Sequence, residues 1–280
     1  MRDRRKTGLS AWVCAALCAA GAWAQQIDVK MTLAYTVYVV GEPVLVQFEI
    51  LNATRDLLEF GTAGSKDVLM VEITQGGQYN EVKPFRSDPF VGALQLKPGQ
   101  SFQHKVELDK WFPLLQEGKY MVRLVVAHGG IRFESTKKSF DVVPGIPLSE
   151  GVQMFVKRQN LKRLFKLVYW PRNQTERLFL RIEDEPGSRM WDSIDLGIML
   201  RGAPPKLDLS PEGEVTVIHR STQDAYIRTV LWSLPDSVEV VERNSLVDPE
   251  ISASQRVKAL YGEMSDGKEA TPKKSWWKFW

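Results

Sequence analysis

A run of alternating apolar side chains between Tyr120 and Ala127 constrains the fold more than any other stretch of the chain. Successive side chains of a β-strand point to opposite faces, so every second residue of this run shares one face. The residues on that face are Tyr120, Val122, Leu124 and Val126. Gly118 precedes the run and Gly129-Gly130 follows it, as is typical of turns. Because these large apolar side chains have to be buried against a second layer, the run predicts a central strand of a layered β-structure.

Other alternating runs lie on both sides of this strand. They cover Val29–Leu33, Val44–Ile50, Val68–Ile73, Phe102–Leu108 and Ile131–Val143. Short strands separated by turns such as Gly41-Glu42-Pro43 are typical of a two-sheet sandwich. The sequence predicts such a sandwich in a domain over residues 26–146, which ends at the turn Pro144-Gly145-Ile146-Pro147.

Four short stretches of this region have the spacing seen in a known superfold. They are Gly41-Glu42-Pro43-Val44, Leu51-Asn52, Leu96-x-Pro98-Gly99 and Gly118-x-Tyr120-x-Val122. Over residues 28–145 the chain resembles the immunoglobulin-like domains of bacterial exported proteins. The resemblance implies that Tyr120 is the corner tyrosine of the sandwich. It implies no activity, because this superfold carries many functions.

The second half of the chain is also rich in short strands. They are predicted over Phe165–Trp170, Arg177–Ile182, Leu196–Leu200, Lys206–Leu209, Glu214–Arg220, Tyr226–Trp232 and Val238–Glu242. Tight turns between them, such as Pro211-Glu212-Gly213, favour a second antiparallel β domain over residues 150–247. The mixed pattern of Leu148–Phe165 fits either a helix or an extended crossover. The predicted fold class is therefore all-β.

The C-terminal part has a different pattern. Asp248-Pro249-Glu250 combines a capping side chain, a proline at the first helical position and an acidic residue near the helix N-terminus. It predicts a short helix over residues 248–262, which stops at Gly262. The polar composition of the following segment predicts a disordered tail over residues 263–280.

The first 24 residues have the features of a signal peptide. A basic start, which includes Arg4 and Arg5, precedes the apolar run Leu9–Gly21 and the small-x-small site Ala22-Trp23-Ala24. The apolar run is shorter than the roughly 20 residues that span a bilayer. We therefore expect cleavage after Ala24 and an extracytoplasmic location, either periplasmic or secreted.

Removal of this segment changes the composition of the chain. Both cysteines, Cys14 and Cys18, lie within it, so the mature chain would have no disulfide, thiolate metal site or cysteine nucleophile. It would also contain 33 basic and 33 acidic side chains. A net charge near zero provides no electrostatic surface for nucleic acid, so no nucleic-acid partner is expected.

The sequence contains no catalytic motif, and we expect no enzymatic activity and no cofactor. The three histidines, His104, His128 and His219, are not spaced as metal ligands. An acidic stretch over residues 183–195 includes Glu183-Asp184-Glu185 and is placed on a loop, where oxygen ligands could hold calcium. Its spacing is not that of an EF-hand, and we favour a solvated loop. The phosphate-loop pattern is also absent from Gly61–Lys66.

The last residues form the candidate contact site for a partner or a membrane. This aromatic–basic end consists of Lys273, Lys274, Trp276, Trp277, Lys278, Phe279 and Trp280. Tryptophan rings settle at a membrane interface while lysines meet anionic headgroups, and the same residues suit a docking motif. The alternative is that the tail folds back onto its own second domain.

Together these features predict an exported, non-enzymatic binding or scaffold protein of the bacterial envelope that acts through protein–protein contacts. Two other functions stay open. A carbohydrate-binding protein would use exposed tryptophans among Trp111, Trp170, Trp191 and Trp232. A secreted protease inhibitor would use the long loop from Gly76 to Gly92.

Overall fold

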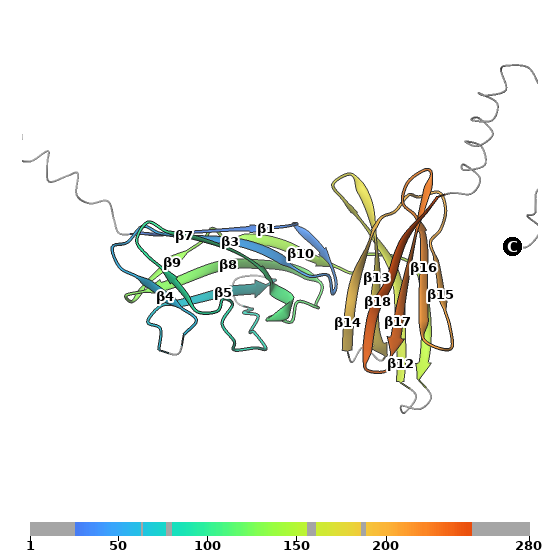
Figure 1. Cartoon of the computed structure of the whole chain (residues 1–280), viewed down its shortest axis with the longest axis horizontal. Helices are drawn as coiled ribbons and strands as arrows, with labels where there is room; N and C mark the ends of the chain where they lie inside the picture. The colour runs from blue at the N-terminus through green and yellow to red at the C-terminus, as the bar shows by residue number, and fades with distance from the viewer. Residues whose placement is uncertain (1–25, 63, 77–79, 156–160, 186–188, 248–280) are drawn as a thin grey trace, which may run out of the picture. The chain divides into compact units, whose positions relative to one another are not determined.

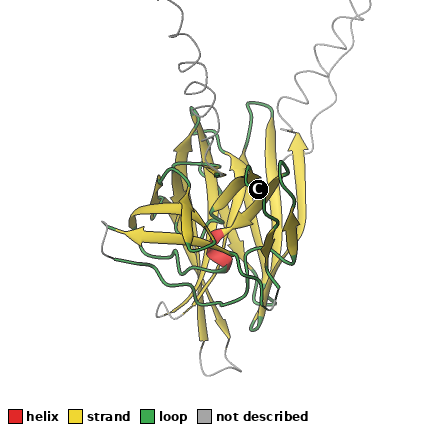
Figure 2. Ribbon diagram, turned by 90° about the vertical axis from the view of Figure 1, so that its left-hand side faces the viewer, coloured by secondary structure: helices red, strands yellow, loops and turns green. Residues whose placement is uncertain are grey.

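The chain is all-β. The computed structural model describes residues 26–62, 64–76, 80–155, 161–185 and 189–247. Figure 2 shows these residues almost entirely as strands and loops, with the short 3-10 helix η2 (Leu108–Lys110) as a helical turn. The chain divides between Val143 and Pro144 into two compact units, called unit 1 and unit 2 below.

Unit 1 contains two main sheets and a short strand pair. Sheet A has the order β1 (Ile27–Leu33), β3 (Leu45–Asn52), β7 (Ser101–Glu107). Sheet B has the order β2 (Val37–Val39), β10 (Lys138–Val143), β8 (Gly118–His128), β5 (Val68–Gln75), and β9 (Ile131–Glu134) also pairs with β8. The short pair is β4 (Leu58–Phe60) with β6 (Leu94–Leu96). In Figure 1, β1, β3 and β7 form one layer of this unit, and β5 and β8 lie in the other.

The strand β8 is the centre of the unit 1 core. Tyr120, Val122, Leu124 and Val126 are all buried, as their alternation predicts. β8 pairs with β5 on one side and with β10 and then β9 on the other. The Tyr120 ring stacks on Phe140 at a centroid distance of 5.3 Å, and its hydroxyl donates to the carbonyl oxygen of Gln116 at 2.8 Å.

The sequence did not predict three of the strands in unit 1. β2, β4 and β6 have three residues each, which is too short for an alternating pattern to be recognised. β2 pairs in parallel with β10, a contact that joins residues about a hundred positions apart. The predicted run Ile131–Val143 is also divided, because β9 and β10 are separate strands with Ser135 between them. The Ser135 hydroxyl accepts the amide hydrogen of Leu124 at 3.0 Å.

Unit 2 consists of two four-stranded antiparallel sheets. Sheet D has the order β11 (Ile146–Phe155), β12 (Leu161–Arg172), β13 (Thr175–Glu185), β14 (Arg189–Ile198). Sheet E has the order β15 (Lys206–Leu209), β16 (Glu214–Arg220), β17 (Ala225–Leu234), β18 (Ser237–Val247). One apolar core draws on both sheets, with Phe165, Leu167, Leu178, Leu180 and Ile182 from sheet D and Val215, Val217 and Leu231 from sheet E.

Two predictions for the second half differ in part from the structure. Residues 148–155, expected to be a helix or an extended crossover, lie in β11, which shows no alternation because its residues are exposed on both faces along much of its length. The strand expected at Leu196–Leu200 begins earlier, at Arg189, because charged residues also occupy its exposed positions. The predicted helix 248–262 and tail 263–280 lie outside the described residues.

Arg163 on β12 is the most unusual core residue. Its side chain is 0% exposed and points into unit 2. Its Nε donates to Asp184 at 3.0 Å, and its Nη atoms donate to Ser233 Oγ, the Leu234 carbonyl and the Pro235 carbonyl at 2.7–3.1 Å. The guanidinium also lies 4.1 Å from the centroid of the Trp191 ring. This one side chain therefore joins sheet D to the turn between β17 and β18.

Candidate functional site

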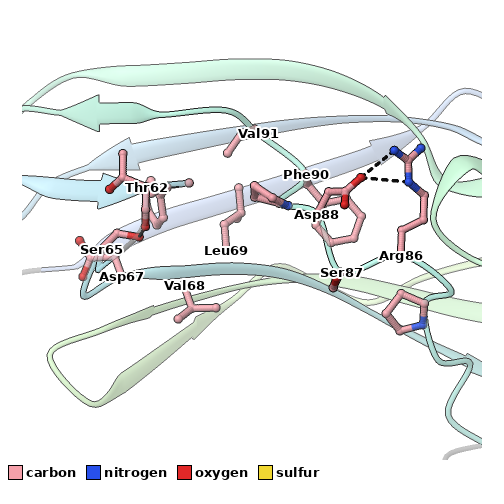
Figure 3. Close-up of a pocket in the computed structure, with 14 residues that line it drawn as sticks. Thr62, Ser65, Asp67, Val68, Leu69, Arg86, Ser87, Asp88, Phe90 and Val91 are labelled. Carbon is pink, nitrogen blue, oxygen red and sulfur yellow. Dashed lines mark hydrogen bonds and ion pairs between the residues drawn. The ribbon is translucent and has the colours of Figure 1, made fainter.

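A cleft in unit 1 is a candidate site. It has a volume of about 490 Å³. It lies between the segment from the end of β4 to the start of β5, within residues 60–69, and the loop of residues 84–91. Figure 3 shows Thr62, Ser65 and Asp67 at one end of the cleft and Arg86 and Asp88 toward the other. The apolar surface between these ends is provided by Val68, Leu69, Phe90 and Val91.

The first wall depends on Gly61. Its φ angle is +73°, and a Cβ at this position would lie 2.5 Å from the carbonyl oxygen of Gly92. Only glycine allows both this backbone conformation and this close approach. The chain then turns at Thr62, whose carbonyl oxygen accepts the Ser65 amide hydrogen at 3.1 Å and the Ser65 hydroxyl at 2.9 Å. The two loops are thus in direct backbone contact at the base of the cleft.

The second wall is held against η2 and the residues after it. The Phe85 amide donates to the Trp111 carbonyl at 2.8 Å, and Trp111 Nε1 donates to the Asp88 carbonyl at 3.3 Å. Arg86 forms a two-point contact with Asp88, with Nε and Nη2 at 3.0 and 2.6 Å from Oδ2. The Phe90 ring packs on Trp111 at 5.2 Å. These contacts position the loop without a disulfide.

A buried carboxylate closes the polar end of the cleft. The Asp67 side chain is almost fully buried, and its Oδ2 accepts the Glu59 amide hydrogen at 2.8 Å. Its Oδ1 lies 2.7 Å from Nδ1 of His128 on β8. His128 is therefore oriented by a carboxylate, a pairing across 61 residues that the sequence pattern did not reveal.

Exposed apolar side chains lie beside the cleft. Val68 is 46% exposed and Phe85 is 60% exposed. An apolar surface between polar ends, with apolar groups at the rim, suits a protein segment that inserts one or two side chains.

The structure does not describe the residues predicted as the contact site. The aromatic–basic end, Lys273 to Trp280, lies outside the described residues. The cleft was not predicted as a site, although both of its loops attracted notice in the sequence. In the sequence, the Gly76–Gly92 loop is the candidate inhibitory element, and Gly61–Lys66 lacks the phosphate-loop pattern. The two segments lie side by side only in the folded chain, so no local sequence pattern predicts the cleft between them.

The acidic stretch was wrongly placed on a loop. Its described residues lie on β13 and β14, where cations on neighbouring strands contact them. The contacts are Glu183 with Lys166, Asp184 with Arg163, Glu185 with Lys162 and Asp195 with Arg177. Burial raises the pKa of Asp192. Among the described residues, no group of three or more His, Cys, Asp or Glu side chains is arranged to hold a metal ion.

The four tryptophans considered for sugar binding differ in their surroundings. Trp191 is contacted by two guanidinium groups, Arg163 at 4.1 Å and Arg189 at 3.6 Å from the ring centroid. Trp111 packs on Phe90, and Trp170 is half-buried. Trp232 is exposed. The described parts of the chain contain no helix that is long and apolar enough to cross a membrane.

No protein-family model matches the sequence, and no curated protein matches it. Among solved structures, the sporulation control protein Spo0M from Bacillus subtilis is 12% identical, with a TM-score of 0.29. The match covers 86% of this chain and 98% of Spo0M. A DUF4784 family protein from Bacteroides caccae is 7% identical, with a TM-score of 0.18, over 78% of this chain and 70% of that protein. At these TM-scores we transfer no residue role or ligand from either structure.

Proposed function

We propose that this chain is an exported, non-enzymatic binding or scaffold protein of the bacterial envelope that acts through protein–protein contacts. The observation that carries the proposal is the cleft of unit 1, with its apolar floor and exposed apolar rim. Its loops are attached to a sandwich whose core is fully buried around β8. Binding sites on proteins are commonly built in this way, from loops that a rigid sheet scaffold positions.

The chemistry of the cleft favours a protein segment as its ligand. Val68, Leu69 and Phe90 offer apolar contact, while the Ser65 and Thr62 hydroxyls and the Arg86–Asp88 pair offer hydrogen-bonding groups at the ends. An extended segment presents apolar side chains and backbone amides at alternating positions, which matches this distribution. The proposal requires neither a cofactor nor nucleic acid.

The resemblance of unit 1 to immunoglobulin-like domains is part of the same proposal. It is supported by the Tyr120 hydroxyl, which bonds back to the Gln116 carbonyl four residues upstream, as a corner tyrosine does. Export rests on the sequence of residues 1–24, with cleavage after Ala24. Domains of this class commonly serve as recognition modules, which fits a binding role outside the cytoplasm.

Photocrosslinking from the cleft tests this function. With p-benzoylphenylalanine in place of Val68, we expect a covalent adduct with one envelope protein in living cells, because the rim would lie against the bound segment. The matched control is the same replacement at Val152, which is 48% exposed on β11 of unit 2. Adducts are measured by immunoblotting and mass spectrometry.

Equal adduct patterns from the two positions would contradict the role of the cleft. A second arm replaces Val68 with arginine and places the crosslinker at Leu69. The adduct should disappear because the arginine side chain at position 68 is larger than valine and charged, and would project into the apolar part of the cleft. An undiminished adduct in this arm would also count against the proposal.

We further propose that the aromatic–basic end contacts a partner or the membrane surface. Three of the seven tryptophans after residue 24 fall within the last five residues, next to Lys278 and Phe279. Aromatic groups at this density mark interaction sites, and lysines add attraction to anionic headgroups. Whether the tail acts on its own chain or on another molecule is decided by its removal.

Deletion of residues 275–280 is expected to reduce association with the envelope fraction and leave the thermal unfolding midpoint unchanged. The reason is that the deleted rings would be interaction groups and not core. Fractionation and calorimetry measure the two effects. The control replaces the three tail lysines with glutamine, which isolates the electrostatic part. If instead the midpoint falls and fractionation stays the same, the tail stabilises its own chain.

A further inference from the structure

His219 lies in the interior of unit 2 without a normal hydrogen bond. It is on β16, its residue is 1% exposed, and neither Nδ1 nor Nε2 has a hydrogen-bond partner. The backbone of Ile198 is close enough to raise the pKa of the ring but does not make a hydrogen bond of normal geometry. The Thr229 hydroxyl on the adjacent strand β17 is also buried and without a partner. An imidazole in this setting is stable only in its neutral form.

The charged groups around His219 belong to the contact between β18 and β14. Arg243 on β18 is opposite Thr229 in the sheet and donates from Nη2 to the backbone carbonyl of Asp195 on β14 at 2.9 Å. The Asp195 carboxylate is held by Arg177 of β13, with its Oδ2 at 2.7 Å from Nη2. Arg220 follows His219 on β16 and donates to the Gln223 carbonyl. Asp195 is therefore already neutralised by a partner, and Arg243 would repel a protonated His219.

Sheets D and E are joined by side chains at two ends. At one end, Arg163 bonds to Ser233, Leu234 and Pro235. At the other end, Arg243 bonds to the Asp195 carbonyl close to His219. Arg163 is buried, and its charge is paired with Asp184. Arg243 is exposed, and its contact with β14 is a single hydrogen bond. The second end is thus the weaker one.

We propose that His219 is an acid-sensitive latch, whose protonation separates β18 from β14 while the Arg163 end of unit 2 stays closed. This property is independent of the cleft and of the binding function proposed for it. Protonation would place a second positive charge beside Arg243, on a ring whose two nitrogens have no hydrogen-bond partner. If β18 separated from β14, water would reach the His219 ring, and the charges of His219 and Arg243 would move apart.

The direction of the pH dependence follows from the burial of His219. Burial lowers the pKa of the ring from 6.5 to about 4, and repulsion from Arg243 acts in the same direction. The closed state of unit 2 is fully stabilised when the pH is above 6.5, the pKa of the His219 ring in the unfolded chain. This stabilisation is lost as the pH falls toward 4. At pH 5 the closed state should be disfavoured about 30-fold relative to pH 7.5.

Hydrogen exchange of the full chain, followed by mass spectrometry, tests the latch. After correction for the intrinsic effect of pH on exchange, protection in β14 and β18 should fall about 30-fold between pH 7.5 and pH 5. Protection in β11 and β12 should fall far less. In His219→Gln, which cannot be protonated in this range, the loss should vanish. His104→Gln, at an exposed position of β7, is the matched control and should behave like the unaltered chain.

Three results would overturn the latch. One is an undiminished protection of β14 and β18 at pH 5, and another is an equal loss in His219→Gln. The third is an equal loss across β11, β12, β14 and β18, which would indicate global unfolding. If His219→Gln does not fold, NMR titration of the His219 ring in the unaltered chain decides, because an ionisation near pH 6.5 would contradict the proposal.

Discussion

Replacement of Arg163 by alanine is expected to destabilise unit 2 by about 3–5 kcal/mol, the usual cost of removing one partner of a buried ion pair. The variant would leave Asp184, which is itself buried, without its cation. It would also leave the Ser233 hydroxyl and the Leu234 carbonyl without their donor. Urea unfolding of the full chain, followed by tryptophan fluorescence, measures the loss, since Trp170, Trp191 and Trp232 all lie in unit 2.

Arg189→Ala is the matched control for Arg163→Ala. Arg189 is exposed and contacts the same Trp191 ring at 3.6 Å. Exposed cation–π contacts contribute only about 0.5–1 kcal/mol, so the control should lose no more than that. Equal losses in the two variants would show that the buried hydrogen bonds of Arg163 contribute little.

Leu124→Ala is expected to destabilise unit 1 by about 2–5 kcal/mol, the range for removing a buried leucine side chain. Leu124 is fully buried in β8, between β5 on one side and the Ser135 segment on the other. The cavity would lie in the centre of the sandwich, where neighbouring strands restrict collapse. Urea unfolding monitored through Trp111, the tryptophan of unit 1 after residue 24, measures the effect.

Leu115→Ala provides the comparison within the same unit. Leu115 is 47% exposed, and its truncation should change the free energy of unfolding by no more than about 0.5 kcal/mol. A loss below 1 kcal/mol in Leu124→Ala would mean that β8 is not central to the core. A similar loss in both variants would have the same meaning.

The sequence predicted the parts of the fold in which burial follows a regular pattern. β8 and β16 alternate between buried and less buried positions, and their ranges were predicted closely. β11 was missed because its residues are exposed on both faces along much of its length. β2, β4 and β6 were missed because three residues are too few to show a period. The all-β class followed from the long strands alone.

The candidate site was much harder to predict. The cleft depends on the contact of Gly61 with Gly92, which lies 31 positions further along the chain. The Asp67–His128 pair joins residues 61 positions apart. Neither has a local signal. The acidic residues of β13 were predicted on a loop for a related reason. Their composition is typical of a loop, but cations on the neighbouring strand, such as Lys166, pair with them and stabilise them within the sheet.

The buried position of Arg163 also has a consequence for biosynthesis. The guanidinium is made 70 residues before the Ser233 hydroxyl that accepts one of its hydrogen bonds, and the Leu234 and Pro235 carbonyls follow still later. Sheet D is complete at Ile198, well before those acceptors leave the ribosome. Until then Asp184 is the one hydrogen-bond acceptor of this guanidinium, among those described above, that has already been made. We therefore expect that Arg163 becomes fully bonded, and the two sheets of unit 2 close around it, only after β17 has been made.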